Sequence, residues 1–317
     1  MKKVVRAWCA CLLCLWLPAF ASAKTARAAW VWEPDAYAML ESRAEADHAL
    51  AFLHAHRVDT LYLYADAYAG RNLIVDAPDA YRRFIVRAHR DGFRVYALLG
   101  SAFLHTEEYV RPAQRPQALA MLRRVLDYNA AAPAGARFDG INYDIEPHLL
   151  ADWDSHRDAL LQGFVDMTAA FVDARRAAGQ RLPIGPAMPF WWDGISLPTA
   201  RGARPVSELV ADLCDYVALM DYRNHAEGSD GIVAHAADEM RYAERTGKQV
   251  VVGLELTPGE PAKITFAGRG EADLAREMDA TARAFGDSPA FAGFALHHYR
   301  GYVDWVRAQA PRGPSAR

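Results

Sequence analysis

The segment "FDGINYDIEPH" (residues 138–148) combines the pattern of a buried strand with three carboxylates, Asp139, Asp144 and Glu146. Phe, Ile and Tyr residues lie between these acids. A buried carboxylate costs on the order of several kcal/mol unless it is paired, hydrogen-bonded or protonated. A strand that carries such residues therefore indicates a chemical role.

The side chains of this strand alternate between two faces. The even-numbered residues 140–146, including Asn142, Asp144 and Glu146, share one face, and Ile141, Tyr143 and Ile145 share the other. Asp139 begins the strand at its far end on the second face. We expect Asp139 to make structural hydrogen bonds.

Short apolar segments rich in Val, Tyr, Trp and Leu alternate with longer amphipathic stretches, as in repeated βα units. Several of these stretches end in Gly, as helices often do. We predict eight strands, at residues 28–34, 58–66, 93–101, 138–147, 182–192, 215–224, 248–258 and 291–302. Eight units fit a single (β/α)8 TIM barrel over residues 24–310, without a second domain. The alternative is an open doubly wound sheet, but no Gly-x-Gly-x-x-Gly turn follows the first strand.

The N-terminal residues 1–23 have the features of a secretory signal peptide. Three basic residues precede an apolar stretch, and Ala21-Ser22-Ala23 forms a cleavage signal. The alternative is an uncleaved anchor, but the apolar stretch is shorter than the roughly 20 residues that span a bilayer. We therefore expect an exported protein, periplasmic or secreted, without membrane insertion after cleavage, and a flexible tail at residues 311–317.

Composition excludes some partners. Three of the four cysteines lie within residues 1–23, so Cys214 remains alone and cannot form an internal disulfide. The formal charge is −3, and removal of three basic residues with the signal makes it −6. This acidity, without clusters of Lys and Arg, argues against a nucleic-acid partner. We expect a monomer.

Polar residues gather at the C-terminal ends of the predicted strands, where TIM barrels have their active sites. Asp144 and Glu146 would face the barrel axis as neighbours, so that one carboxyl raises the pKa of the other. A carboxyl protonated near neutrality can act as a general acid. Alternation also sends Glu255 inward. In the predicted strand at residues 215–224, alternation allows two orientations. Either Met220 and Tyr222 face the barrel axis, or Asp221 and Arg223 do.

The aromatic residues suggest a sugar-binding cleft. Trp32 and Trp191 lie near the ends of the first and fifth strands, and indole faces suit the apolar faces of sugars. The last strand offers His297 and Tyr299 on one face and His298 on the other. Barrel metallohydrolases usually carry H-x-H on the first strand, and "WVWEP" lacks it. We therefore expect hydrogen-bonding histidines, with no metal and no cofactor.

The segment "DGINYDIE" resembles the fourth-strand motif D-G-x-D-x-D-x-E of family 18 glycoside hydrolases, and "ALMDYR" is similar to the family's M-x-Y-D. The resemblance implies that Glu146 donates a proton to the glycosidic oxygen. It also implies that Asp144 orients the substrate's 2-acetamido group and that Tyr222 hydrogen-bonds to it. Such enzymes retain configuration through an oxazolinium formed by the substrate.

The chain departs from this family at several positions. Asn142 stands where the family has an acid, and Arg223 stands where its M-x-Y-D motif has Asp. "LHHY" (296–299) replaces an expected Trp on the eighth strand, and "LLGSA" (98–102) is a poor match to the third-strand motif S-x-G-G. We therefore describe the chain as family 18-like.

The expected function is a retaining glycoside hydrolase with a carbohydrate substrate and with Glu146, Asp144, Tyr222 and Glu255 as catalytic candidates. Glu255 has two alternative roles. It is either the nucleophile of a clan-A-like retaining glycosidase, or a salt-bridge partner of Arg223. A non-catalytic carbohydrate-binding barrel is a further alternative, although the presence of Glu146 favours an enzyme. The candidate substrate-binding residues are Trp32, Asn142, Trp191, Met220, Asp221, Arg223, His297 and Tyr299.

Overall fold

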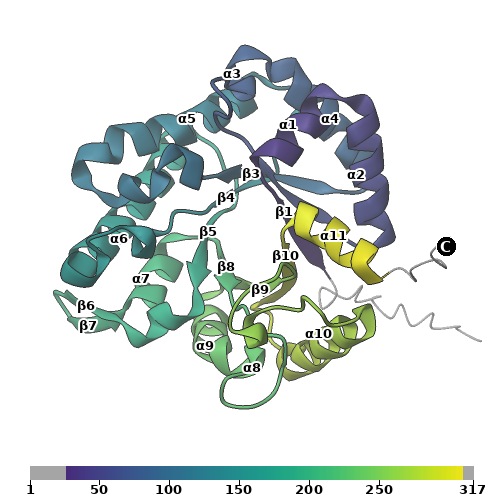
Figure 1. Cartoon of the computed structure of the whole chain (residues 1–317). Helices are drawn as coiled ribbons and strands as arrows, with labels where there is room; N and C mark the ends of the chain where they lie inside the picture. Colours follow the sequence, from purple (N-terminus) through teal and green to yellow (C-terminus); the bar gives the residue numbers. More distant parts are fainter. Residues whose placement is uncertain (1–25, 310–317) are drawn as a thin grey trace, which may run out of the picture.

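The computed structural model describes residues 26–309. Eight parallel strands close into a barrel in the order β1-β10-β9-β8-β5-β4-β3-β2, with helices around the outside (Figure 1). The prediction of a single (β/α)8 TIM barrel is confirmed. The predicted signal peptide at residues 1–23 and the predicted tail at residues 311–317 lie outside the described residues.

Each of the eight predicted segments overlaps one barrel strand, but the observed strands are shorter. They are β1 (Arg27–Val31), β2 (Thr60–Tyr64), β3 (Arg94–Leu99), β4 (Gly140–Tyr143), β5 (Ile184–Pro189), β8 (Tyr216–Met220), β9 (Gln249–Glu255) and β10 (Phe291–His297). Most of the residues that were predicted as strand but lie outside the observed strands are at the C-terminal ends. There the polar and aromatic residues leave the ladder and form loops, so Asp144 and Glu146 follow β4 rather than belong to it.

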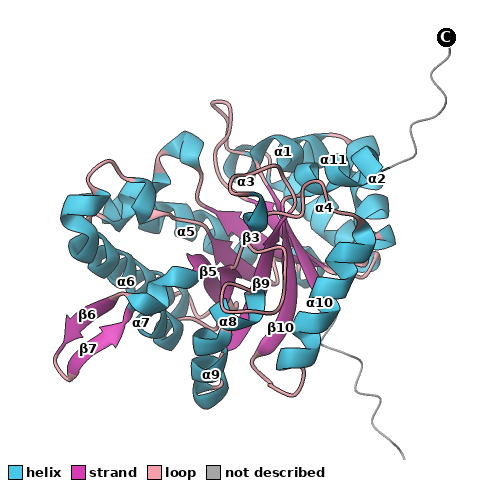
Figure 2. Ribbon diagram, turned by 60° about the horizontal axis from the view of Figure 1, so that its bottom comes forward, coloured by secondary structure: helices cyan, strands magenta, loops and turns pink. Residues whose placement is uncertain are grey.

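Helices follow the strands and cover the outside of the barrel (Figure 2). Their apolar stripes pack against the outward faces of the strands, as in other barrels. The longer ones are α1 (Glu33–Glu41), α2 (Arg43–Ala55), α4 (Pro78–Arg90), α5 (Arg115–Ala131), α6 (Trp153–Ala177), α7 (Val206–Leu213), α9 (Ala237–Thr246), α10 (Glu271–Phe285) and α11 (Tyr299–Gln309). Two shorter ones are α3 (Leu73–Asp76) and α8 (Ile232–His235).

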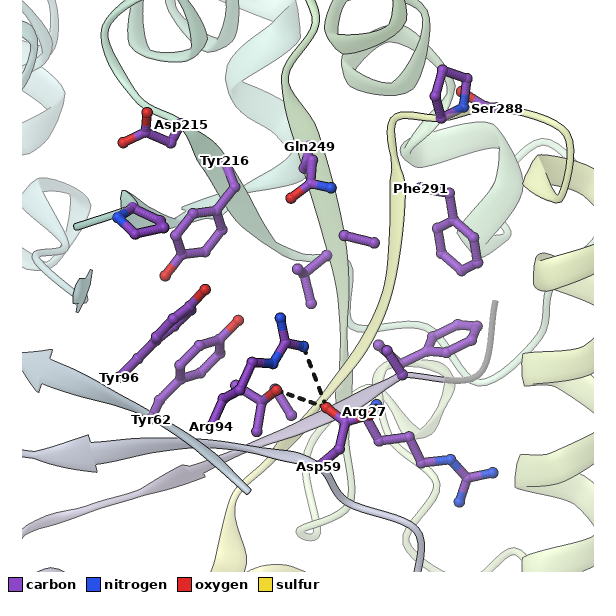
Figure 3. A pocket seen from close by; sticks show the side chains of 18 of the residues that line it. Arg27, Asp59, Tyr62, Arg94, Tyr96, Asp215, Tyr216, Gln249, Ser288 and Phe291 are labelled. Atoms are coloured by element: carbon purple, nitrogen blue, oxygen red, sulfur yellow. Dashed lines mark hydrogen bonds and ion pairs between the residues drawn. The ribbon is translucent and has the colours of Figure 1, made fainter. Parts of the chain in front are cut away.

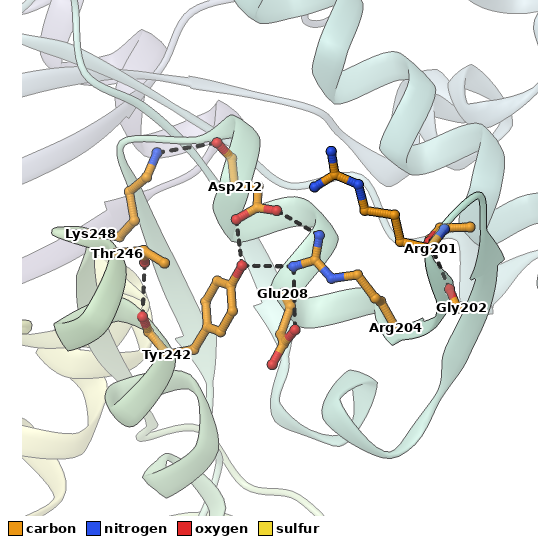
Figure 4. Close-up of polar contacts among 9 residues, drawn as sticks. Arg201, Gly202, Arg204, Glu208, Asp212, Tyr242, Thr246 and Lys248 are labelled. Atoms are coloured by element: carbon orange, nitrogen blue, oxygen red, sulfur yellow. Dashed lines mark hydrogen bonds and ion pairs between the residues drawn. The ribbon is translucent and has the colours of Figure 1, made fainter.

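A two-stranded hairpin, β6 (Ser196–Thr199) and β7 (Gly202–Pro205), was not predicted from the sequence. Most of its residues are exposed or half-buried, so it lacks the apolar alternation that reveals a strand. The hairpin stands apart from the barrel sheet (Figure 2). The guanidinium of Arg204 ties it to α7 and α9 by donating to Asp212 at 2.8 Å and to the Tyr242 hydroxyl at 2.7 Å (Figure 4).

Strand β4 has the two faces that its alternation predicts. Ile141, Tyr143 and Ile145 belong to the outer core between barrel and helices. Asn142 is fully buried inside the barrel, where its side-chain oxygen accepts from the Trp30 indole N–H at 2.9 Å. Its amide donates to the carbonyl of Gly185 at 3.2 Å.

Asp139 has the structural role expected of it. Its carboxylate accepts from the backbone N–H of Val95 at 2.7 Å and lies 2.8 Å from Nε2 of His89. These contacts tie the start of β4 to β3 and to α4. No helix among residues 26–309 is both long and apolar enough to cross a membrane.

We predict that Asn142→Ala lowers the free energy of unfolding by about 1 to 3 kcal/mol, because it leaves the buried Trp30 N–H without an acceptor. Urea denaturation at neutral pH measures the loss. In a Trp30→Phe background the same substitution should cost less, because the donor is already gone. An equal loss in both backgrounds would contradict the role assigned to this hydrogen bond.

Candidate active site

The barrel has a hollow at each end. A funnel of about 710 Å³ opens at the N-terminal ends of the strands, lined by the rings of Tyr62, Tyr96 and Tyr216 (Figure 3). At its rim the Asp59 carboxylate accepts from the guanidinium of Arg94 at 3.4 Å. Barrel enzymes carry out their chemistry at the opposite end, where the loops after the strands supply functional groups. The funnel is therefore not the candidate active site.

A cleft of about 490 Å³ opens at the C-terminal ends of the strands. Four of the predicted site residues line it: Trp32 after β1, Asp144 and Glu146 after β4, and His297 at the end of β10. These residues are far apart in sequence, and closure of the barrel brings them to one cavity. The volume is that of an ordinary small-ligand site.

Asp144 is the most perturbed acid of this cleft. Burial raises its pKa well above the ordinary value, and the negative charges of Glu146 and Glu33 raise it further. Its Oδ1 atom is buried without a hydrogen-bond partner. The chain approaches Asp144 closely at Gly100, where a Cβ would lie 2.0 Å from the Asp144 carbonyl oxygen and where φ is +102°. Only glycine fits there.

Glu33 is a buried acid of the cleft that the sequence analysis did not single out. It is 4% exposed, and its carboxylate accepts a hydrogen bond from the Ser101 hydroxyl. Glu33 lies in the predicted first strand, but it is the first residue of α1. The sequence signal that could have identified Glu33 is its place as a carboxylate just after a barrel strand.

Glu146 is more accessible, with 30% of its side chain exposed. Its Oε2 atom lies 3.0 Å from Nε2 of His148, the second residue after it. The His148 ring lies against two indoles, with centroids 6.1 Å from Trp153 and 5.5 Å from Trp191. Trp191 is therefore half-buried beside the partner of Glu146, and it does not line the cleft itself.

The two choices left open on the sixth barrel strand are now decided. Met220 packs on the apolar cluster inside the barrel, and the Tyr222 ring lies 5.7 Å from that of His297. Burial, together with the charges of Asp144, Glu255 and Glu146, raises the pKa of Tyr222 well above its ordinary value. The Tyr222 hydroxyl therefore stays protonated and can donate a hydrogen bond. Tyr222 does not line the cleft itself but lies beside His297, which does.

Asp221 and Arg223, which were predicted to bind substrate, do not line the cleft, and both have protein partners. Asp221 is fully buried and accepts from His235 at 3.2 Å. Burial raises the pKa of Asp221 to about 6, although the hydrogen bond from His235 opposes this. Arg223 pairs with Asp230 at 2.9 Å and lies over the ring of Phe190.

Both carboxylate oxygens of Glu255 have hydrogen-bond partners. Its Oε1 atom accepts from the backbone N–H and the hydroxyl of Thr257, each at 2.6 Å. Its Oε2 atom lies 2.7 Å from Nδ1 of His297, within hydrogen-bond distance. Burial raises the pKa of Glu255, but the hydrogen bonds from His297 and Thr257 outweigh it and leave the pKa below its ordinary value. The alternative role of Glu255 as a salt-bridge partner of Arg223 is wrong, because Arg223 pairs with Asp230 and Glu255 with His297.

Two further predictions need correction. Tyr299 is buried at the start of α11, where its ring packs against Phe52, because the strand ends at His297 and alternation no longer applies. Asn142 lies inside the barrel at 0% exposure and does not line the cleft. The cleft is instead lined by two exposed apolar residues that were not predicted, Phe103 (74% exposed) and Leu149 (59% exposed).

Among residues 26–309, no group of three or more His, Cys, Asp or Glu side chains could hold a metal ion. Some acidic residues of the cleft have protein partners. Asp35 pairs with Arg300, and the Glu107 carboxylate lies 3.2 Å from Nδ1 of His105. Carboxyl and imidazole groups of this kind can transfer protons and form hydrogen bonds.

Comparison with known proteins finds no family model and no characterised protein that matches the sequence. Solved structures share the fold. An exo-β-1,4-mannosidase from Opitutaceae bacterium strain TAV5 is 14% identical, with a TM-score of 0.55 over 86% of this chain and 51% of that chain. The present chain thus spans about half of the mannosidase's length.

Two chitinases also share the barrel over nearly their whole length. A GH18 chitinase from Cycas revoluta in complex with (GlcNAc)3 is 12% identical, with a TM-score of 0.51 over 89% of this chain and 97% of that chain. A class V chitinase from Nicotiana tobaccum is 12% identical, with a TM-score of 0.50 over 89% of this chain and 96% of that chain. At such identities the likeness shows the fold.

We predict that Asp144→Asn is more stable to unfolding than the parent at pH 7. The folded pKa of Asp144 lies above the ordinary value of 3.8, so its ionisation in the folded state costs stability as the pH rises. The gain should shrink as the pH falls towards 3.8. Denaturant titrations between pH 4 and pH 7 measure it.

Asp152→Asn is the matched control, because a hydrogen bond from Arg111 lowers the pKa of Asp152. This control should be no more stable than the parent at pH 7. An Asp144→Asn protein of equal or lower stability than the parent at pH 7 would contradict the raised pKa.

Proposed function

We propose that this chain is a retaining glycoside hydrolase that cleaves an oligosaccharide or polysaccharide by a family 18-like, substrate-assisted mechanism. The observation that carries the proposal is the pair of carboxyls after β4, Asp144 and Glu146, in a cleft at the catalytic end of a TIM barrel. The raised pKa of Asp144 and the apolar rim of the cleft support it. The solved glycosidases with the same fold agree with this class.

In the first step Glu146 donates its proton to the glycosidic oxygen, and the bond from C1 to that oxygen breaks. The carbonyl oxygen of the substrate's own 2-acetamido group attacks C1 and forms an oxazolinium. Asp144 orients this group, and Tyr222 donates a hydrogen bond to it. Water then attacks C1 while the Glu146 carboxylate takes its proton. The bond from C1 to the oxazolinium oxygen breaks and the 2-acetamido group re-forms, which restores the enzyme and retains the configuration.

The alternative with Glu255 as nucleophile has less support. A nucleophilic carboxylate needs a free oxygen that reaches C1 of the sugar. Both oxygens of Glu255 are engaged by Thr257 and His297, and the side chain does not line the cleft. Substrate assistance requires no such protein group. Export of the chain remains a proposal, based on the pattern of residues 1–23.

We predict that Glu146→Gln lowers kcat on a cleavable glycan by at least about 100-fold, because the amide cannot donate the required proton. A panel of polysaccharides and chromogenic glycosides, scored for new reducing ends, identifies the glycan and measures the loss. Glu244→Gln, an exposed position on α9, is the matched control and should keep full activity. A fully active Glu146→Gln protein would refute the proposal.

A second prediction separates the two mechanisms. If the substrate supplies the nucleophile, sodium azide should not restore the activity of Glu255→Gln, and no glycosyl azide should form. Mass spectrometry of the products measures this directly. Formation of a glycosyl azide only in the variant would favour Glu255 as the nucleophile and would overturn substrate assistance.

A further inference from the structure

Glu255 and His297 occupy opposed positions on neighbouring strands. Their Cα atoms are partners in the parallel ladder of β9 and β10, at the C-terminal end of each strand. Glu255 is 9% exposed and lies behind the cleft, whereas His297 lines it. The hydrogen bonds of this carboxylate therefore reach the cleft through the histidine.

The hydrogen bonds of Glu255 fix which nitrogen of His297 carries a proton. The backbone N–H of Thr257 can only donate, and it occupies Oε1 of Glu255 together with the Thr257 hydroxyl. The pKa of Glu255 lies below its ordinary value, so the side chain is an ionised carboxylate that accepts on both sides, and Nδ1 of His297 must donate to Oε2 at 2.7 Å. In the neutral ring this leaves Nε2 as an acceptor.

The next contact agrees with this tautomer. The indole N–H of Trp32, which can only donate, points to Nε2 of His297 at 3.3 Å. Thr257, Glu255, His297 and Trp32 thus form one chain in which every donor meets an acceptor. The two rings lie edge to face, with an interplanar angle of 72°.

We propose that Glu255 and His297 are positioning residues that fix the indole of Trp32 in the cleft by setting the tautomer of His297. The inference rests on the proposed function, in which the cleft binds sugar. Since the indole N–H is used by His297, Trp32 presents its ring face to a ligand rather than a hydrogen-bond donor. Ring faces bind the C–H surfaces of sugars by stacking.

The substitution Glu255→Gln tests the chain because it reverses one hydrogen bond. The two donors of Thr257 still require an acceptor, so the amide oxygen of the glutamine takes the place of Oε1. Its NH2 group then faces Nδ1 of His297, which must become the acceptor, and the proton moves to Nε2. An N–H on Nε2 opposes the Trp32 N–H, and the bond to the indole is lost.

The measurement is ¹⁵N NMR of the histidine ring nitrogens and the indole N–H groups in the ligand-free protein. The variants His297→Gln and Trp32→Phe assign the two signals. We expect a protonated Nδ1 on His297 in the parent and a protonated Nε2 in Glu255→Gln, with a changed Trp32 indole signal. Glu239→Gln, a buried carboxyl on α9 away from the cleft, is the matched control and should change neither signal.

Kinetics on a cleaved glycan provide the second readout. Loss of one hydrogen bond that orients Trp32 should raise KM by roughly 3- to 10-fold, with a smaller change in kcat. In a Trp32→Phe background Glu255→Gln should have no further effect on KM, because the phenyl ring has no N–H to hold. A purely structural role of Glu255 would give the same loss in both backgrounds.

Two results would overturn the inference: a parent protein whose His297 carries its proton on Nε2, or an unchanged indole signal in Glu255→Gln. The parent measurement needs no variant of Glu255, so the inference stays testable if that variant fails to fold. The NMR readout also needs no glycan. Its failure is therefore distinct from the failure of Glu146→Gln to lose activity, which would refute the proposed function.

Discussion

The closed parallel ladder is the constraint on which the rest of the structure depends. Closure occurs where β1 pairs with β10, with Ala28 opposite Ala295, and it brings the first and last strands side by side (Figure 1). Trp32 and His297 become neighbours only through this pairing, although 265 positions separate them. In an open sheet these strands would be edges, and the cleft would lose one wall.

The cleft concentrates negative charge in a confined space. Asp144, Glu146 and Glu33 approach one another there, and burial adds to their repulsion in raising the pKa of Asp144. Acids held this close together lower the stability of the folded protein, but the raised pKa of Asp144 suits proton transfer. This is the usual trade-off between stability and activity at a functional site. Gly100 makes the arrangement possible, because any side chain at this position would collide with the backbone of Asp144.

The contrast between two carboxylate–histidine pairs, Glu255–His297 and Asp221–His235, shows what alternation can and cannot predict. Glu255 and His297 lie on strands, so alternation placed both on the inner side. Asp221 lies one residue beyond β8, and its partner His235 is on α8, so this pair lies outside the barrel. Tyr299 was misplaced for the same reason, since period-2 alternation ends where the ladder ends.

The sequence by itself determined the eight βα units, the inward face of β4 and the candidacy of Asp144 and Glu146, because these follow from local periodicity and strand order. Tertiary structure alone decided which side chains share the cleft. It turned Trp32 towards His297, gave Glu255 a histidine rather than an arginine as partner, buried Asn142 and added Glu33 and Phe103 to the lining. The physical reason is that loops after the strands are positioned by long-range packing and hydrogen bonds, which leave no periodic pattern in the chain.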